Sequence, residues 1–147
     1  MNRYKINIMF VCHGNICRSP MAEFIFKDLA KKQGIADHFL VASSATSTEE
    51  ICNGIGNPVY PPAKAELERH GLSCGGKRAV KLKKSDYDKY DLFIGMDSAN
   101  IRNMLRIFGG DPAGKVHTTP TRVHQRLSQN NLRKRQISCE TTADLSK

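Results

Sequence analysis

The hydrophobic and polar positions along this chain follow two different periods. Short apolar runs rich in β-branched residues are typical of buried parallel strands. Longer segments with apolar residues at i, i+3, i+4 and i+7 are typical of amphipathic helices. The expected strands cover residues 5–11, 39–41, 92–96 and 115–117, and the expected helices cover residues 20–33, 61–70 and 98–108.

Strands that alternate with helices predict an α/β fold with three layers, α/β/α, around a four-stranded parallel sheet. The first helix is expected to use Ser19 as its N-cap and Pro20 as its first helical residue. Residues 44–58 are expected to form a polar loop. The face of the first helix expected to be apolar consists of Met21, Phe24, Ile25 and Leu29.

A phosphate loop is predicted directly after the first strand, where residues 12–18 read Cys-His-Gly-Asn-Ile-Cys-Arg before Ser-Pro. The backbone N–H groups of such a loop can surround an anion, and the helix N-terminus adds positive potential. Thiolate, the nucleophilic form of cysteine, is favoured in that setting. We therefore expect Cys12 to attack a phosphate ester while the planar fork of Arg18 holds two of its oxygens. The Ser19 hydroxyl can donate to the sulfur.

Residues 11–23 resemble the signature of the low-molecular-weight protein tyrosine phosphatases, and residues 41–47, 69–71 and 96–100 also match family patterns. The resemblance runs from about residue 5 to residue 117. It implies that phosphotyrosine is dephosphorylated through a phosphocysteine intermediate, without a cofactor, and that inorganic phosphate is released. The implied catalytic residues are Cys12, Arg18 and Ser19, and the implied phosphate-binding residues are His13, Gly14, Asn15, Ile16 and Cys17.

The resemblance also implies a network of hydrogen bonds that supports the loop. Ser43 and His70 would join Asn15 and Ser19 in it. The alternative for His70 is an ordinary histidine at a helix C-terminus, where a partial negative charge favours it. The resemblance further places residues 47–57 beside the site. Family members often carry an aromatic residue there, whereas this chain has Thr48, Glu49 and Glu50.

The general acid is not identified by the sequence. A proton donor to the leaving group typically contributes about 10²–10⁴-fold to the rate, and the family supplies it from an Asp-Pro-aromatic loop after the fourth strand. The only Asp-Pro here is at 111–112, which lies before that strand and is followed by Ala113. We therefore expect Asp111 to belong to an ordinary turn.

The chain divides into a phosphatase-like domain at residues 1–117 and an atypical basic tail at residues 118–147. The chain has a net charge of +9, and the tail has no apolar period and a net charge of +4. We interpret the tail as a truncated, frame-shifted or otherwise replaced C-terminus. Its basic residues are Arg122, Arg126, Arg133, Lys134, Arg135 and Lys147.

The cysteines argue against a metal site, because no CxxC pair occurs. Cys17 is expected either to trap an oxidised Cys12 as a disulfide or to fill space under the loop. No apolar stretch approaches the roughly 18 residues of a membrane span, and no signal-peptide core is present. The cytoplasm is therefore the expected location. The five cysteines are Cys12, Cys17, Cys52, Cys74 and Cys139.

Other function classes fit the sequence less well. A pseudo-phosphatase that binds phosphate or phosphotyrosine with little turnover is the main alternative, because the acid is missing. Phosphoarginine is disfavoured by Ile16, where those family members have threonine, and arsenate reduction would need two further paired cysteines. Nucleic-acid binding rests on the basic tail alone, without interleaved aromatics or a zinc-finger spacing. The expected partner is thus a phosphotyrosine protein or an aryl phosphate.

Overall fold

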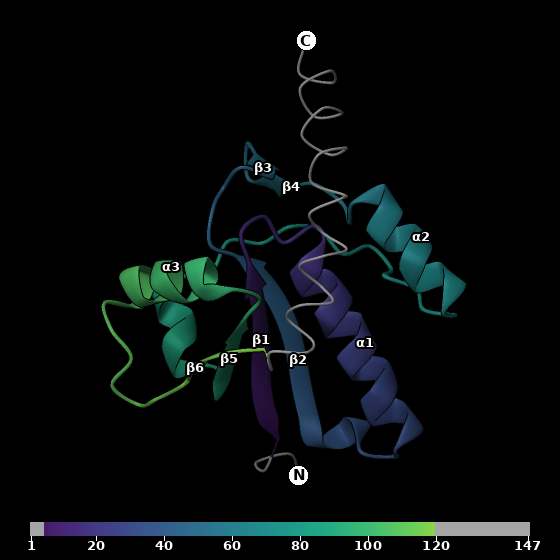
Figure 1. Ribbon diagram of the computed structural model, residues 1–147, viewed down its shortest axis with the longest axis horizontal. Coiled ribbons are helices and arrows are strands. Elements are labelled where there is room, and N and C mark those ends of the chain that lie inside the picture. Colours follow the sequence, from purple (N-terminus) through teal and green to yellow (C-terminus); the bar gives the residue numbers. More distant parts are fainter. Residues whose placement is uncertain (1–4, 120–147) are drawn as a thin grey trace.

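The structure is a computed structural model and describes residues 5–119. Its main sheet has four parallel strands in the order β2-β1-β5-β6 (Figure 1). This arrangement confirms the predicted α/β class and the four-stranded parallel sheet. The strands are β1 Ile6–Cys12, β2 Phe39–Ala45, β5 Leu92–Gly95 and β6 Val116–Thr118.

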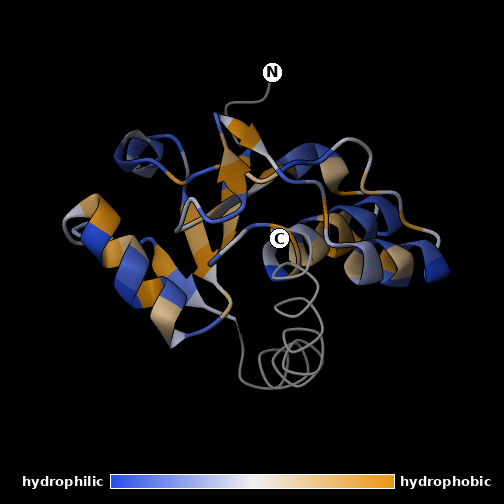
Figure 2. Cartoon of the chain, turned by 90° about the horizontal axis from the view of Figure 1, so that it is seen from above, coloured by the Kyte–Doolittle hydropathy of each residue, from blue (hydrophilic) through white to orange (hydrophobic). Residues whose placement is uncertain are grey.

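Helices cover both faces of the sheet, and the apolar strands lie between them (Figure 2). The helices are α1 Arg18–Lys32, α2 Pro61–Arg69 and α3 Ser98–Phe108, and two 3₁₀ turns are η1 Ala36–His38 and η2 Lys84–Asp88. Alternate residues of β1 point to opposite faces. Ile8 and Phe10 pack with Phe26 of α1, whereas Met9 and Val11 pack with the cluster that contains Met104 of α3. The three predicted layers are therefore present.

The helix α3 begins and ends where the sequence predicts, at Ser98 and Phe108. Asp97 is its N-cap and accepts a hydrogen bond from the Asn100 N–H at 2.9 Å. Gly109 follows the last turn with φ of 77°, which glycine adopts without the strain of a Cβ atom. At Gly95 on β5, an added Cβ would lie 2.9 Å from Ile101, so this glycine lets α3 approach the sheet closely.

The expected apolar face of α1 is wrong in part. Ile25 and Leu29 are 38% and 51% exposed, and the residues that face the sheet include Ala22 and Phe26. Both stripes have helical spacing, so only the contact with the sheet decides between them. The expected N-cap is also wrong: the helix begins at Arg18 without a side-chain cap, and the Ser19 side chain turns toward the loop instead.

The expected polar loop at residues 44–58 is shorter than predicted and contains a small hairpin. The strand β2 continues to Ala45, and β3 Ile51–Cys52 pairs antiparallel with β4 Ile55–Gly56. Two-residue strands leave too short an alternation to recognise in a sequence. The turn between them has Asn53 and Gly54 at positive φ.

The boundary expected at residue 117 falls inside a structural element. The strand β6 continues to Thr118, and the Thr119 N–H still donates to the Gly95 carbonyl at 3.1 Å. Residues 120–147, which hold most of the expected basic tail and Cys139, lie outside the described residues. Within residues 5–119, no helix is long and apolar enough to cross a bilayer.

Candidate active site

The loop at residues 12–18 joins the carboxyl end of β1 to the first turn of α1. Its carbonyl groups face outward: Cys12 accepts from the Thr46 N–H, His13 from the Ser47 N–H, and Ile16 from the Tyr60 N–H. Asn15 has φ of 59°, the left-handed conformation that asparagine tolerates better than most residues. With these carbonyls engaged outside the loop, its N–H groups are left to face an anion.

The Cys12 sulfur lies inside this loop, and the residue is only 3% exposed. Its Sγ is 3.0 Å from the Ser19 Oγ and accepts a hydrogen bond from the Asn15 backbone N–H at 3.2 Å. Both groups can donate a hydrogen bond to the sulfur. The arrangement can therefore stabilise a thiolate nucleophile.

Asn15 connects the loop to the connector behind it. Its side-chain Nδ2 donates to the Ser19 Oγ at 2.8 Å, and its Oδ1 accepts from the Val80 N–H at 3.0 Å. Asn15 is 1% exposed and Ser19 is fully buried, so water does not compete with these contacts. Because the Ser19 oxygen already accepts from Asn15, its hydroxyl hydrogen is free to donate to the Cys12 sulfur.

Arg18 is held in place by an acidic partner. Its Nη1 donates to the Asp97 Oδ2 at 2.6 Å, and Arg18 is only 6% exposed. The other carboxylate oxygen of Asp97 accepts from the Asn100 N–H at the start of α3. A guanidinium has five N–H donors, so this contact orients Arg18 and leaves donors for a phosphate.

Ser43, Glu23 and Lys77 form a second layer beside the loop. The Ser43 Oγ donates to the Glu23 Oε1 at 2.5 Å, the Lys77 Nζ donates to the Ser43 carbonyl at 3.0 Å, and Lys27 pairs with Glu23 at 2.6 Å. Burial lowers the pKa of Lys77; the negative charges of Glu23 and Cys12 act in the opposite direction. Ser43, which was expected to join the hydrogen-bond network that supports the loop, donates its hydroxyl hydrogen to Glu23.

Comparison with known proteins identifies the family. The family model described as low molecular weight phosphotyrosine protein phosphatase matches residues 7–142. The chain belongs to this family. The match extends past residue 117, where the expected resemblance ended.

Individual members of the low molecular weight phosphotyrosine protein phosphatases give the same result. The protein-tyrosine-phosphatase YfkJ of Bacillus subtilis is 39% identical over 104 residues, 71% of this chain and 64% of that protein. Its crystal structure has a TM-score of 0.72 at 36% identity and covers 78% of this chain and 69% of that one. The human phosphatase is 38% identical over 68% of this chain and 60% of its own length. The chain thus spans about three fifths of the curated relatives it matches.

A solved phosphatase of similar extent also matches. SP-PTP, the low molecular weight protein tyrosine phosphatase from Streptococcus pyogenes, has a TM-score of 0.70 at 27% identity. The match covers 88% of this chain and 92% of that one.

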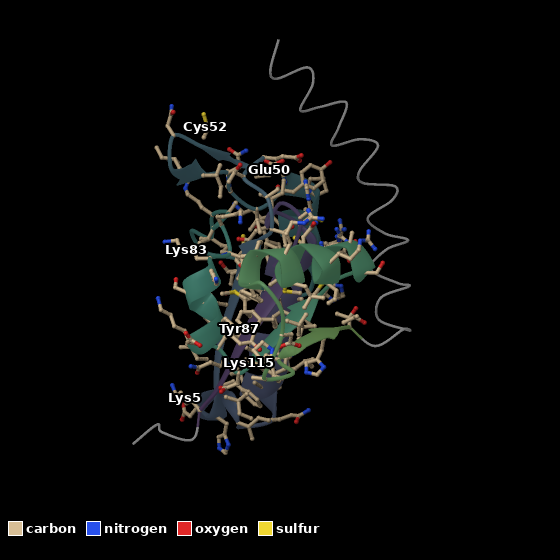
Figure 3. The ribbon with its side chains drawn as sticks, turned by 90° about the vertical axis from the view of Figure 1, so that its left-hand side faces the viewer. Lys5, Glu50, Cys52, Lys83, Tyr87 and Lys115 are labelled. Carbon is tan, nitrogen blue, oxygen red and sulfur yellow. The ribbon has the colours of Figure 1, made fainter. Side chains whose placement is uncertain are left out.

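The segment that contains the β3–β4 hairpin forms a wall beside the phosphate loop. The His13 Nε2 lies 3.0 Å from the Glu49 Oε2, and an added Cβ on Gly14 would lie 3.1 Å from the Glu50 Cγ. This segment therefore borders the loop, as the family resemblance implied. Figure 3 shows Glu50 and Cys52 at this end of the molecule.

His70 lies away from the phosphate loop. It follows α2 with its side chain 71% exposed, and its Nε2 is 3.4 Å from the Glu66 Oε1. The expectation that it braces the loop does not match this position. Lys77 is the residue from this stretch that contacts Ser43 instead, and nothing in the sequence distinguishes it from the other lysines.

Asp111 lies near the amino ends of the parallel strands, because it precedes β6, whereas Cys12 lies at the carboxyl end of β1. Its Oδ1 accepts from the Tyr87 hydroxyl and the Lys115 N–H, both at 2.7 Å, and its Oδ2 accepts from the Val116 N–H. Figure 3 places Tyr87 and Lys115 far from Glu50. Burial opposes ionisation, but these hydrogen bonds outweigh it and lower the pKa of Asp111. Its place and its ionised state do not suit a general acid for Cys12.

Cys17 packs against the cluster that contains Met21, Val59 and Cys74, so its side chain contacts the core beneath the loop. In the described part of the chain, no group of three or more His, Cys, Asp or Glu side chains could hold a metal ion.

Proposed function

We propose that this chain is a cysteine-dependent phosphomonoesterase that dephosphorylates phosphotyrosine through a phosphocysteine intermediate. The position of the Cys12 sulfur is the observation that supports this most. It lies between the Ser19 hydroxyl and the Asn15 N–H, in a loop that ends at Arg18. Family membership supports the same chemistry.

In the first step, the Cys12 thiolate attacks phosphorus. The S–P bond forms, the P–O bond to the aryl group breaks, and the aryl oxygen leaves with the bonding electron pair. Arg18 and the loop N–H groups stabilise the charge on the three phosphoryl oxygens. Because Asp97 holds one end of the guanidinium, Arg18 enters this step already oriented.

In the second step, water attacks the phosphocysteine. The new P–O bond forms as the S–P bond breaks, and inorganic phosphate leaves. The sulfur departs as a thiolate, and the Ser19 hydroxyl 3.0 Å away donates a hydrogen bond to it. The wall beside the loop has Glu49 and Glu50, so it offers no aromatic stacking surface to a tyrosine ring.

The setting proposed for this reaction is the cytoplasm, where thiols stay reduced. There, the Cys17 thiol would attack a sulfenic acid at Cys12 and release water, which forms a protective disulfide. The alternative is that Cys17 only fills space beneath the loop, where it packs against the core. Inorganic phosphate is the product, and the substrate is a phosphotyrosine protein or an aryl phosphate.

A pseudo-phosphatase that binds phosphotyrosine with little turnover is the second candidate. The position of Asp111 favours this candidate. The only Asp-Pro of the sequence lies at the opposite end of the strands from Cys12, so it cannot protonate a leaving group there. A proton donor is typically worth about 10²–10⁴-fold.

Hydrolysis of aryl phosphates with graded leaving groups distinguishes the two candidates, with Cys12→Ser as the inactive control. A competent phosphatase hydrolyses all of them at similar rates, since protonation removes the dependence on leaving-group pKa. An impaired enzyme slows steeply as the leaving group becomes more basic. No turnover of even the best leaving group, together with retained phosphate binding, would leave the pseudo-phosphatase.

A further inference from the structure

A cavity of about 200 Å³, half-open to solvent, lies between the segment that leads into α2 and the connector that follows this helix. Three of its lining side chains are cationic: Lys64, Lys77 and Arg78. None of the lining residues in the described part of the chain is acidic. The space is far larger than the roughly 10–15 Å³ that one water needs.

The cations of the cavity have more donors than the protein accepts. The Lys77 Nζ donates to the Ser43 carbonyl and the Arg78 Nη1 donates to the Gly56 carbonyl at 2.9 Å. A lysine has three N–H donors and an arginine has five, so these two contacts do not use all of their donors. Gly75 and Gly76 form another part of the wall, with open space where a Cβ would lie, so a ligand can approach their backbone.

The segments around the cavity also hold the phosphate loop from behind. The Tyr60 N–H donates to the Ile16 carbonyl at 2.7 Å, and the Val80 N–H donates to the Asn15 Oδ1. None of residues 12–18 lines the cavity, so it is separate from the pocket around Cys12. A ligand in it would nevertheless contact the support of the loop through Lys77.

We propose that this cavity is a second oxyanion site that takes a phosphate-sized group. Its excess of N–H donors and its lack of acids select a compact anion. Two sources share this chemistry: free inorganic phosphate, and a second phosphoryl group on a substrate peptide. Only the second source rests on the proposed function.

The first test titrates the ¹⁵N-labelled full chain with inorganic phosphate after Arg18→Ala has weakened the loop around Cys12. We expect saturable shifts of the Gly75 and Gly76 amide signals. Lys64→Gln combined with Arg78→Gln should raise the dissociation constant about tenfold, as expected for the loss of charge-assisted hydrogen bonds. The matched control, Lys84→Gln with Arg106→Gln, removes two exposed charges elsewhere and should change little.

The wild-type chain serves if Arg18→Ala does not fold, because the two glycine signals and those of residues 12–18 should then titrate with different constants. Absent or non-saturable shifts, or equal affinity in the double variant, would overturn the site.

The second test separates the two sources of phosphate. It compares kcat/KM for peptides with one and two phosphotyrosines in the wild type and in the Lys64 and Arg78 double variant. A preference for the doubly phosphorylated peptide that the double variant loses identifies the substrate as the source. A ratio near one, with the titration intact, identifies free phosphate. If neither peptide is hydrolysed, the proposed function fails, while the titration still decides on the cavity.

Discussion

The direction of the Ser19 hydroxyl hydrogen determines whether the Cys12 sulfur accepts a hydrogen bond from it. The Ser19 oxygen accepts from the Asn15 amide, so its own hydrogen points toward the sulfur 3.0 Å away. Both residues are buried, which prevents water from replacing either contact. In the proposed reaction, Ser19 is therefore placed to stabilise the thiolate as it departs from phosphorus.

We predict that Ser19→Ala lowers kcat about tenfold or more, because a hydrogen bond to a charged sulfur contributes roughly 1.5–3 kcal/mol. The measurement is single-turnover hydrolysis, which should show slow breakdown of phosphocysteine. Ser44→Ala is the control, since the buried Ser44 Oγ has no hydrogen-bond partner among the described residues. An equal loss in both variants would contradict the assigned role.

The contact between Asp97 and Arg18 gives a second prediction at this scale. Asp97→Asn should lower kcat/KM about tenfold, because Arg18 loses the charge that orients it. The free energy of unfolding should fall by about 1–3 kcal/mol, because the nearly buried Arg18 loses its charged partner, whereas asparagine keeps the N-cap of α3. Urea unfolding beside steady-state kinetics separates the two effects. Unchanged kinetics would show that Arg18 needs no partner.

The nearness of residues along the chain explains which parts of the site the sequence predicted. Cys12 and Arg18 lie in one short loop, so a local pattern is enough to pair them. Arg18 and Asp97 are 79 positions apart, and α3 brings them together. Lys77 likewise reaches Ser43 only through the path of the connector.

At the scale of elements, Asp111 joins the 3₁₀ turn η2 to the start of β6. It accepts from the Tyr87 hydroxyl on one side and from the Lys115 and Val116 N–H groups on the other. These contacts close the turn after α3. We therefore infer that Asp111 contributes to the stability of the fold.

We predict that Asp111→Ala lowers the free energy of unfolding by about 1–2 kcal/mol at pH 7, a modest value because the carboxylate is near solvent. Its pKa is lowered in the folded state, so its contribution is complete above the unfolded pKa and is lost as pH falls through the folded pKa. The difference between wild type and variant should therefore shrink in acid, below a pH of about 4. Urea unfolding at several pH values measures this difference.

The leaving-group dependence of the Asp111→Ala variant is the companion measurement. It should match that of the wild type. A steeper dependence in the variant would mean that Asp111 protonates the leaving group after all.

The sequence predicted the boundaries of an element best where a residue at the boundary itself starts or ends the helix. The helix α3 begins at Asp97 and ends before Gly109, and both residues act through their own backbone or side chain. The buried face of α1 was not predictable, because Ile25 and Leu29 have the same helical spacing as the residues that contact the sheet.

At the scale of the whole molecule, the net charge of +9 creates a field that favours anionic substrates. We predict that kcat/KM for a phosphotyrosine peptide falls severalfold as salt rises from about 20 to about 200 mM, because the screening length shortens from tens of ångströms to below 10 Å. The value of kcat should change little, since it does not include encounter. A kcat/KM that is independent of salt would contradict this steering.

The sequence by itself determined the fold class and the position of the reactive loop. Periodicity, glycines and helix caps act over a few neighbouring residues, and Cys12 and Arg18 fall within that reach. Only the tertiary structure decided which face of α1 is buried and which residues support the loop, and only it set Asp111 apart from Cys12. Those outcomes depend on contacts between segments far apart in the chain, and a local pattern has no information about them.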